Sequence, residues 1–244
     1  MTAVLAGQPE PPKYFAKMKR VNKEGPAILG QFHIPSKLDA AKLPGLLARQ
    51  ALVIDTRPAA EYAAGHLPGT LNIPLNASFV TWAGWLVQAE EFYLIIDPAT
   101  AEARLGELAR SLAMIGLDRI SGYFDASNAT GTSIVRQIET RELGERLTDV
   151  TVVDVRSENE WALGHIRGAV HVPLGYLADR AAELSREGPI VVQCQSGARS
   201  SIAASVLERL GMTNVMNLSG GMTAWMAAGL PIEEGAHGRQ ATRA

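Results

Sequence analysis

The sequence of 244 residues contains a single cysteine, Cys194, and this scarcity excludes a disulfide within the chain. Any sulfur group that the thiol acquires must therefore be removed by a thiol from outside the chain. Long apolar runs are also missing, because no stretch reaches the roughly 18 residues that span a bilayer. The chain does not open on a basic segment followed by an apolar one. We therefore expect a soluble, cytoplasmic protein with no membrane partner.

Charge of one sign is not in excess either. The net charge of −2 lacks the positive surplus that nucleic-acid binding requires, so we expect no nucleic-acid partner. The five histidines are dispersed along the chain, so we expect no metal centre. With 47% hydrophobic and 20% charged residues the chain can bury a sizeable core. Its length suits two domains of slightly more than about 100 residues each.

The sequence does contain an internal repeat at a constant offset of 99 positions, the separation between Asp55 and Asp154. The recurring motifs are Asp55-Thr56-Arg57 with Asp154-Val155-Arg156, Gly65-His66-Leu67 with Gly164-His165-Ile166, Gly69-Thr70 with Gly168-Ala169, and Pro74 with Pro173. Each copy shows a buried strand, a polar turn, a short helical segment and a Gly-His corner, and then strands alternating with a helix. This alternation predicts the α/β class, with two domains that each hold a parallel sheet flanked by helices.

Strand and helix positions follow from the same pattern. The first copy should have strands at 52–54, 71–74 and 120–124, and the second should have them at 152–153, 170–173 and 215–218. In each copy a helix should end at a glycine, Gly116 or Gly211.

Cys194 follows an apolar stretch, residues 190–192, and begins a polar loop that ends in a helical pattern near Ser200. A strand thus brings the thiol to a helix N-terminus. There the unpaired N–H groups and the helix dipole favour an anion, and Arg199, which four residues separate from Cys194, adds a full positive charge. These features favour the thiolate, so the pattern predicts a nucleophile.

The two copies differ where the chemistry would occur. Residues 93–97 align with residues 190–194, which places Asp97 opposite Cys194. The loop after Asp97 contains Pro98 and Glu102 instead of small residues that expose the backbone. The proline removes an N–H donor and the carboxylate repels an anion. We therefore interpret the first copy as structural.

Four motifs resemble those of rhodanese-type sulfurtransferases. They are the Asp-x-Arg strand end at 154–156, the Gly-His-Ile-x-Gly-Ala corner at 164–169, the Cys-x-x-Gly-x-Arg-Ser loop at 194–200 and the closing segment at 217–231. The resemblance is close over residues 132–234 and degenerate over residues 30–126. It implies a tandem rhodanese with an N-terminal tail or linker at 1–29, an inactive rhodanese-like domain at 30–130 and an active rhodanese domain at 131–244.

The resemblance also implies roles for individual residues. Cys194 would be the catalytic nucleophile that carries a persulfide. We assign Arg199 to the catalytic site, because its charge would stabilise the anionic sulfur rather than take part in a structural ion pair. The substrate-binding loop would contain Gln195, Ser196, Gly197, Ala198 and Ser200, and the supporting residues would be Asp154, Arg156 and Trp225.

The expected reaction is a two-step sulfur transfer without a metal or organic cofactor. The Cys194 thiolate would attack thiosulfate or a low-molecular-weight persulfide, and the enzyme persulfide would then pass its sulfur to sulfite, cyanide or a thiol. Cysteine phosphatases and arsenate reductases are an alternative, although these families place five residues between cysteine and arginine. A non-enzymatic sulfur carrier, with the first copy as a docking surface, is the other alternative.

The amino-terminal residues 7–22 carry a second resemblance. They are similar to the last segment of the metallo-β-lactamase-fold module in fusions of a persulfide dioxygenase with a rhodanese. This resemblance implies a persulfide dioxygenase as a partner of a separately encoded or excised sulfurtransferase half. A basic, solvated tail is the alternative interpretation of this segment.

Overall fold

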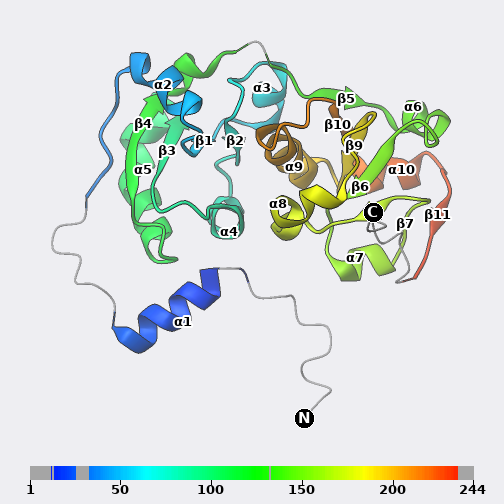
Figure 1. Cartoon of the computed structure of the whole chain (residues 1–244), viewed down its shortest axis with the longest axis horizontal. Helices are drawn as coiled ribbons and strands as arrows, with labels where there is room; N and C mark the ends of the chain where they lie inside the picture. Colours follow the sequence, from blue (N-terminus) through cyan, green and yellow to red (C-terminus); the bar gives the residue numbers. More distant parts are fainter. Residues whose placement is uncertain (1–11, 13, 26–32, 132, 236–244) are drawn as a thin grey trace. The chain divides into compact units, whose positions relative to one another are not determined.

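The computed structural model describes residues 12, 14–25, 33–131 and 133–235. The described residues divide into an amino-terminal unit, up to residue 133, and a carboxy-terminal unit, residues 134–235 (Figure 1). In the described part of the chain, no helix is long and apolar enough to cross a bilayer.

The amino-terminal unit contains one sheet of four parallel strands in the order β2-β1-β3-β4. Its elements are α1 (Tyr14–Glu24), η2 (Ala40–Lys42), α2 (Leu43–Ala48), β1 (Val53–Asp55), α3 (Ala59–Ala64), β2 (Leu71–Asn72), α4 (Phe79–Leu86), β3 (Phe92–Ile96), α5 (Pro98–Ala113), β4 (Ile120–Asp125) and η3 (Ala126–Ala129). All three residues of β1 are buried, as expected for a parallel sheet that is covered on both faces.

The carboxy-terminal unit contains five parallel strands in the order β5-β10-β9-β6-β8. Its elements are β5 (Arg136–Ile138), α6 (Thr140–Glu145), β6 (Thr151–Asp154), α7 (Glu158–Ala162), β7 (His165–Ile166), β8 (Val170–His171), η4 (Leu174–Tyr176), α8 (Leu177–Arg180), η5 (Ala181–Glu183), β9 (Ile190–Gln193), α9 (Ala198–Arg209), β10 (Val215–Leu218), α10 (Gly221–Ala227) and β11 (Ile232–Glu233). Strands β7 and β11 form a separate antiparallel pair.

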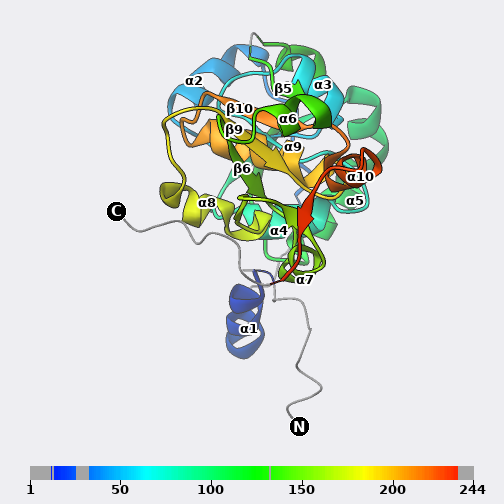
Figure 2. The same cartoon turned by 90° about the vertical axis from the view of Figure 1, so that its right-hand side faces the viewer.

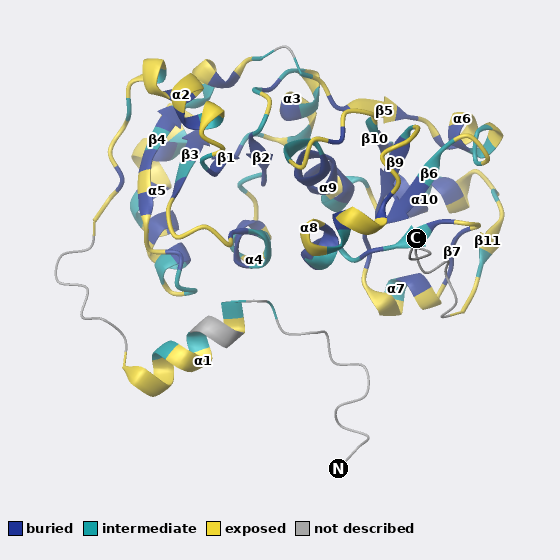
Figure 3. Ribbon diagram, viewed as in Figure 1, coloured by how far each residue is buried: buried dark blue, intermediate teal, exposed yellow. Residues whose placement is uncertain are grey.

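Helices lie on both faces of this second sheet. Figures 1 and 2 show α8 and α9 on one face and α6, α7 and α10 on the other. Trp161 of α7 and Trp225 of α10 join the same buried cluster as Val152 and Val191 of the sheet. The central strands β3 and β9 are almost wholly buried in their respective units (Figure 3). The predicted fold class, parallel sheets flanked by helices in two domains, is therefore confirmed.

The repeat marks equivalent elements in the two units. Strands β1 and β6 match in this way, as do β3 and β9, α5 and α9, and β4 and β10. The pattern predicted neither the edge strand β5 nor helix α1. Of the amino-terminal segment 7–22, residues 14–22 belong to α1, whereas residues 7–11 and 13 lie outside the described residues.

Candidate active site

The loop after β9 places the only cysteine of the sequence beside a helix N-terminus. Cys194 directly follows β9, three residues intervene, and α9 begins at Ala198, two residues earlier than its expected start near Ser200. The helix begins there because Gly197 has a φ of 98° at the N-cap position. That left-handed conformation favours glycine. A Cβ atom at Gly197 would have no neighbour closer than 3.8 Å, so the requirement is conformational rather than spatial.

Two hydrogen-bond donors point at the cysteine sulfur. The backbone N–H of Gly197 donates to Cys194 Sγ at 3.2 Å. The hydroxyl of Ser200 lies 3.4 Å from Sγ and 3.2 Å from Gly197 O, and its single proton can be donated to either acceptor. Cys194 is only 1% exposed and Ser200 is fully buried, so water competes little for these hydrogen bonds. Donors that face a sulfur in a buried setting stabilise its anionic form.

The N-terminus of α10 binds the first two carbonyl groups of the loop. Met222 N donates to Cys194 O at 2.8 Å, and Thr223 N donates to Gln195 O at 3.0 Å. The Thr223 hydroxyl also donates to Gln195 O at 2.9 Å and accepts from Gln195 Nε2 at 3.0 Å. In a trans peptide the N–H points away from the C=O. The N–H groups of Gln195 and Ser196 therefore point away from α10.

Gly221 permits this close approach of α10 to the loop. A Cβ atom at Gly221 would lie 2.2 Å from Cys194 O, and its φ of 56° is again left-handed. The Gly220-Gly221 pair is visible in the sequence, but sequence reasoning missed its contact with the loop. The useful signal would have been a glycine pair directly after the strand next to the cysteine strand.

Arg199 lies in the first turn of α9 and forms a two-point ion pair with Glu160 of α7. Its Nη1 donates to Glu160 Oε2 at 2.7 Å and its Nη2 donates to Oε1 at 2.5 Å. These hydrogen bonds are the main reason that the pKa of Glu160 falls to about 2, and burial opposes the fall. This contact corrects the expectation that Arg199 takes no part in an ion pair, and the sequence did not predict Glu160 as its partner.

The Arg199 guanidinium also interacts electrostatically with Cys194. The hydrogen bond with Glu160 is the largest influence that raises the pKa of the Arg199 guanidinium, and burial opposes it. The charge of Glu160 raises it further, and Cys194 and Asp154 contribute in the same direction. The guanidinium therefore interacts electrostatically with both the carboxylate and the sulfur.

Asp154 and Arg156 form a buried ion pair at the end of β6. Arg156 Nη2 donates to Asp154 Oδ2 at 2.7 Å and to the carbonyl of Gly164 at 2.7 Å. The amino-terminal unit repeats this arrangement, because Arg57 Nη2 donates to Asp55 Oδ2 at 2.7 Å and to a glycine carbonyl at the matching corner. The pair occurs in both units, although only one of them has the cysteine. We therefore interpret it as a structural contact that connects the end of the strand to the Gly-His corner.

The corner histidines also have matching surroundings. His165 stacks on Trp161 with ring centres 3.6 Å apart, and its Nδ1 lies 3.2 Å from Trp161 O. His66 stacks on Tyr62 with ring centres 3.9 Å apart, and its Nδ1 lies 2.9 Å from Tyr62 O. Among the described residues, no group of three or more His, Cys, Asp or Glu side chains could hold a metal ion.

Asp97 takes the cysteine position in the amino-terminal unit and acts as a helix cap. Its Oδ1 accepts hydrogen bonds from Thr100 N at 2.9 Å and from Thr100 Oγ1 at 3.1 Å, and α5 begins at the next residue, Pro98.

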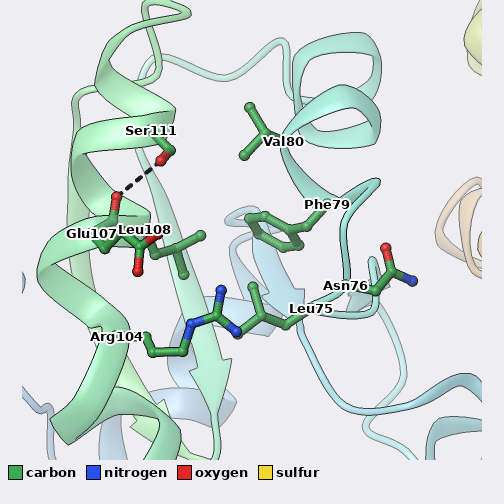
Figure 4. Close-up of a pocket in the computed structure, with 8 residues that line it drawn as sticks. All are labelled: Leu75, Asn76, Phe79, Val80, Arg104, Glu107, Leu108 and Ser111. Carbon is green, nitrogen blue, oxygen red and sulfur yellow. Dashed lines mark hydrogen bonds between the residues drawn. The ribbon is translucent and has the colours of Figure 1, made fainter.

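A pocket of about 70 Å³ in this unit lies between α4 and α5 and does not include Asp97 (Figure 4). Its Ser111 hydroxyl donates to the backbone carbonyl of Glu107 in its own helix, at 3.0 Å. Cys194 is therefore the stronger candidate for a nucleophile.

Comparison with known proteins places both units in one family. Residues 39–114 and 139–228 match the rhodanese-like domain, and the chain belongs to this family. A sulfurtransferase of Allochromatium vinosum is 38% identical over 102 residues, which are 41% of this chain and 95% of that protein. Thiosulfate sulfurtransferase GlpE of Pseudoalteromonas translucida is 36% identical over 90 residues, 37% of this chain and 85% of that protein.

A solved structure also matches. The thiosulfate sulfurtransferase of Pseudomonas aeruginosa is 26% identical, with a TM-score of 0.38, and the match covers 84% of this chain and 42% of that one. The family and the curated relatives support sulfur transfer as the general activity.

Proposed function

We propose that this protein is a sulfurtransferase that moves a sulfane sulfur from thiosulfate or a low-molecular-weight persulfide to sulfite, cyanide or a thiol. A persulfide on Cys194 would be the intermediate. The observation that carries the proposal is the position of Cys194 Sγ, which accepts hydrogen bonds from Gly197 N and Ser200 Oγ at the beginning of α9. The active rhodanese domain would extend over 131–244, and the inactive one over 30–130.

In the first step the Cys194 thiolate attacks the outer sulfur of the donor. With thiosulfate, the new S–S bond forms as the donor's S–S bond breaks, and sulfite leaves with the bonding electron pair. With a thiol persulfide, the thiolate leaves instead. Each route transfers one neutral sulfur atom and leaves Cys194 as a persulfide, so no metal or redox cofactor takes part in the balance.

In the second step an acceptor attacks the outer sulfur of the Cys194 persulfide and regenerates the thiolate. The loop of residues 195–200 stabilises the sulfur anion in both steps through its N–H groups and the Ser200 hydroxyl. The carbonyls of residues 194 and 195 do not oppose this, because α10 binds them on the other side. The hydrogen-bond donors of the loop are already in place before the sulfur donor binds, so little reorganisation of the protein is needed during transfer.

A persulfide dioxygenase is the partner that we propose from the resemblance of residues 7–22. Such an enzyme would consume or supply the same low-molecular-weight persulfides. The test is a coupled assay in which the purified dioxygenase and this protein share a persulfide pool. A change in dioxygenase turnover that disappears with Cys194→Ser would support the partnership, and equal turnover with both forms would contradict it.

The decisive experiment on the function is intact-mass analysis after incubation with each donor. The parent protein should gain one sulfur atom, and the Cys194→Ser variant should gain none while keeping the same melting temperature. Transfer to cyanide should disappear in the same variant. Full activity of the variant, or a parent protein that gains no sulfur from any donor, would contradict the proposal.

A further inference from the structure

Glu160 has a role at the candidate site that neither the repeat nor the family resemblance assigns. It is the third residue of α7, and its carboxylate binds both terminal nitrogens of Arg199. The side chains are partly buried, with 23% exposed for Arg199 and 30% for Glu160. An ion pair in this setting is screened less than one on the open surface.

The pair changes the charge that a sulfur donor meets. Arg199 interacts electrostatically with Cys194, but the carboxylate of Glu160 accompanies it at hydrogen-bond distance. Because the two opposite charges are in direct contact, Glu160 reduces the attraction that Arg199 exerts on an anion. The remaining attraction for an anion comes from the Gly197 N–H, the Ser200 hydroxyl and the end of the helix.

We propose that Glu160 determines donor preference by neutralising Arg199, so that the site favours thiol persulfides over dianionic thiosulfate. This inference rests on the proposed sulfurtransferase function. Thiosulfate brings two negative charges to a site where Glu160 already offsets the positive charge of Arg199. A persulfide of a neutral thiol brings at most one negative charge.

The chemistry with the favoured donor balances without further reactants. The Cys194 thiolate attacks the outer sulfur of R–S–SH, the S–S bond of the donor breaks, and the products are the Cys194 persulfide and R–S⁻. The leaving thiolate takes the one negative charge that the cysteine gave up. With thiosulfate the leaving group would instead be sulfite, which carries more negative charge than R–S⁻.

The chain supplies its own control for this carboxylate. Glu61 lies 99 positions before Glu160 and is likewise the third residue of a short helix, α3, but it is exposed. Within the described residues it has no guanidinium partner.

The experiment compares Glu160→Gln with Glu61→Gln. For each variant, kcat/KM is measured with thiosulfate and with the persulfide of 2-mercaptoethanol, at fixed pH and ionic strength. Glutamine keeps the size and an acceptor oxygen but removes the negative charge. Glu160→Gln should raise the ratio of thiosulfate to persulfide kcat/KM about fivefold, as expected for one charge a few ångströms away in a partly screened site. Glu61→Gln should leave the ratio unchanged.

A measurement on the parent protein covers the case in which Glu160→Gln does not fold. If Arg199 is neutralised, kcat/KM for thiosulfate should change little between low and moderate salt. A free guanidinium would make it fall steeply as salt is added.

The outcomes separate this inference from the function on which it rests. An unchanged donor ratio in Glu160→Gln, an equal change in Glu61→Gln, or a steep salt dependence in the parent would overturn the role of Glu160 alone. A parent protein that forms no persulfide with either donor would overturn the sulfurtransferase proposal and this inference together.

Discussion

The two units place different side chains at the same point of the same architecture. Asp97 follows β3 and Cys194 follows β9, and each accepts a hydrogen bond from the backbone N–H three residues later. In the amino-terminal unit α5 begins immediately after Asp97, so the carboxylate caps the helix. In the carboxy-terminal unit three loop residues precede α9. The same acceptor position thus stabilises a helix in one unit and presents a sulfur in the other.

What the units share is as instructive as what separates them. Both have an Asp-Arg pair with a buried aspartate at the end of the first central strand, and a histidine stacked on an aromatic ring at the corner. These contacts exist where no cysteine is present, so they belong to the fold. The loop, its glycine turn and the Glu160–Arg199 pair occur only in the carboxy-terminal unit, and the following predictions test this division.

The largest effect should come from breaking the Asp-Arg ion pair in either unit. Asp154→Ala leaves the buried Arg156 guanidinium without its carboxylate, and Asp55→Ala does the same to Arg57. Each change should lower the free energy of unfolding of its own unit by about 3–5 kcal/mol, the usual cost of an uncompensated buried charge. Urea denaturation followed by fluorescence would measure it. A loss of sulfur transfer by Asp154→Ala with unchanged stability would instead place this residue in the chemistry.

The next effect concerns Arg199. In Arg199→Ala the carboxylate of Glu160 loses its partner and disfavours a nearby thiolate. The pH dependence of Cys194 alkylation should therefore move to higher pH, and use of thiosulfate should fall about tenfold more than use of a neutral donor. Arg199→Lys should rescue only part of the loss, because an ammonium cannot reproduce the two-point contact. An unchanged alkylation profile with equal losses for both donors would remove Arg199 from the site.

The Glu160–Arg199 pair should also make the free energy of unfolding depend on pH in the acidic range. The pKa of Glu160 is lowered to about 2 in the folded protein, below its ordinary value of 4.5. A group with a lowered pKa contributes stability that is fully present above its ordinary value and is lost as the pH falls toward about 2. Because the pair is partly exposed, we expect a contribution of about 1 kcal/mol. The destabilisation caused by Glu160→Gln should shrink as the pH falls from 5 toward 2, whereas a constant difference would exclude this linkage.

These contrasts also show what the sequence could predict. The offset of 99 residues revealed the duplicated α/β architecture, since the Asp-x-Arg and Gly-His motifs mark strand ends and corners in both copies. The glycine and the polar run after residues 190–193 were enough to predict a turn that leads into a helix. Local patterns of this kind depend on residues that are neighbours in the chain, and the structure contains the strands, corners and turn that they predicted.

The parts that sequence reasoning missed depend on distant contacts. Strand β5 has only three residues, two of them exposed, and its pairing with β10 gives it no hydrophobic pattern of its own. Glu160 and Arg199 are 39 positions apart on different helices, so their spacing carries no signal. The role of Gly221 becomes visible only when α10 is packed against the Cys194 carbonyl.

The smallest effects should come from the Asp97 position, and they test the comparison most directly. Asp97→Ala removes the cap of α5 and should cost about 1 kcal/mol of stability. It should leave persulfide formation on Cys194 unchanged, because the amino-terminal unit supplies no group to that reaction in our proposal. Loss of persulfide formation with the fold preserved would show that the first copy shares in catalysis.

A sharper form of this test adds Asp97→Cys to a Cys194→Ser background. The new thiol would occupy the equivalent strand end, but α5 begins at once with Pro98, which has no N–H to donate. Without a glycine turn and a cradle of N–H groups, the thiol should react with iodoacetamide but acquire no sulfur from thiosulfate or a persulfide, as intact-mass analysis would show. Efficient persulfide formation at residue 97 would mean that a cysteine after the strand is sufficient by itself. In that case the presence of the cysteine, and not the loop that follows it, would be the feature that distinguishes the two units.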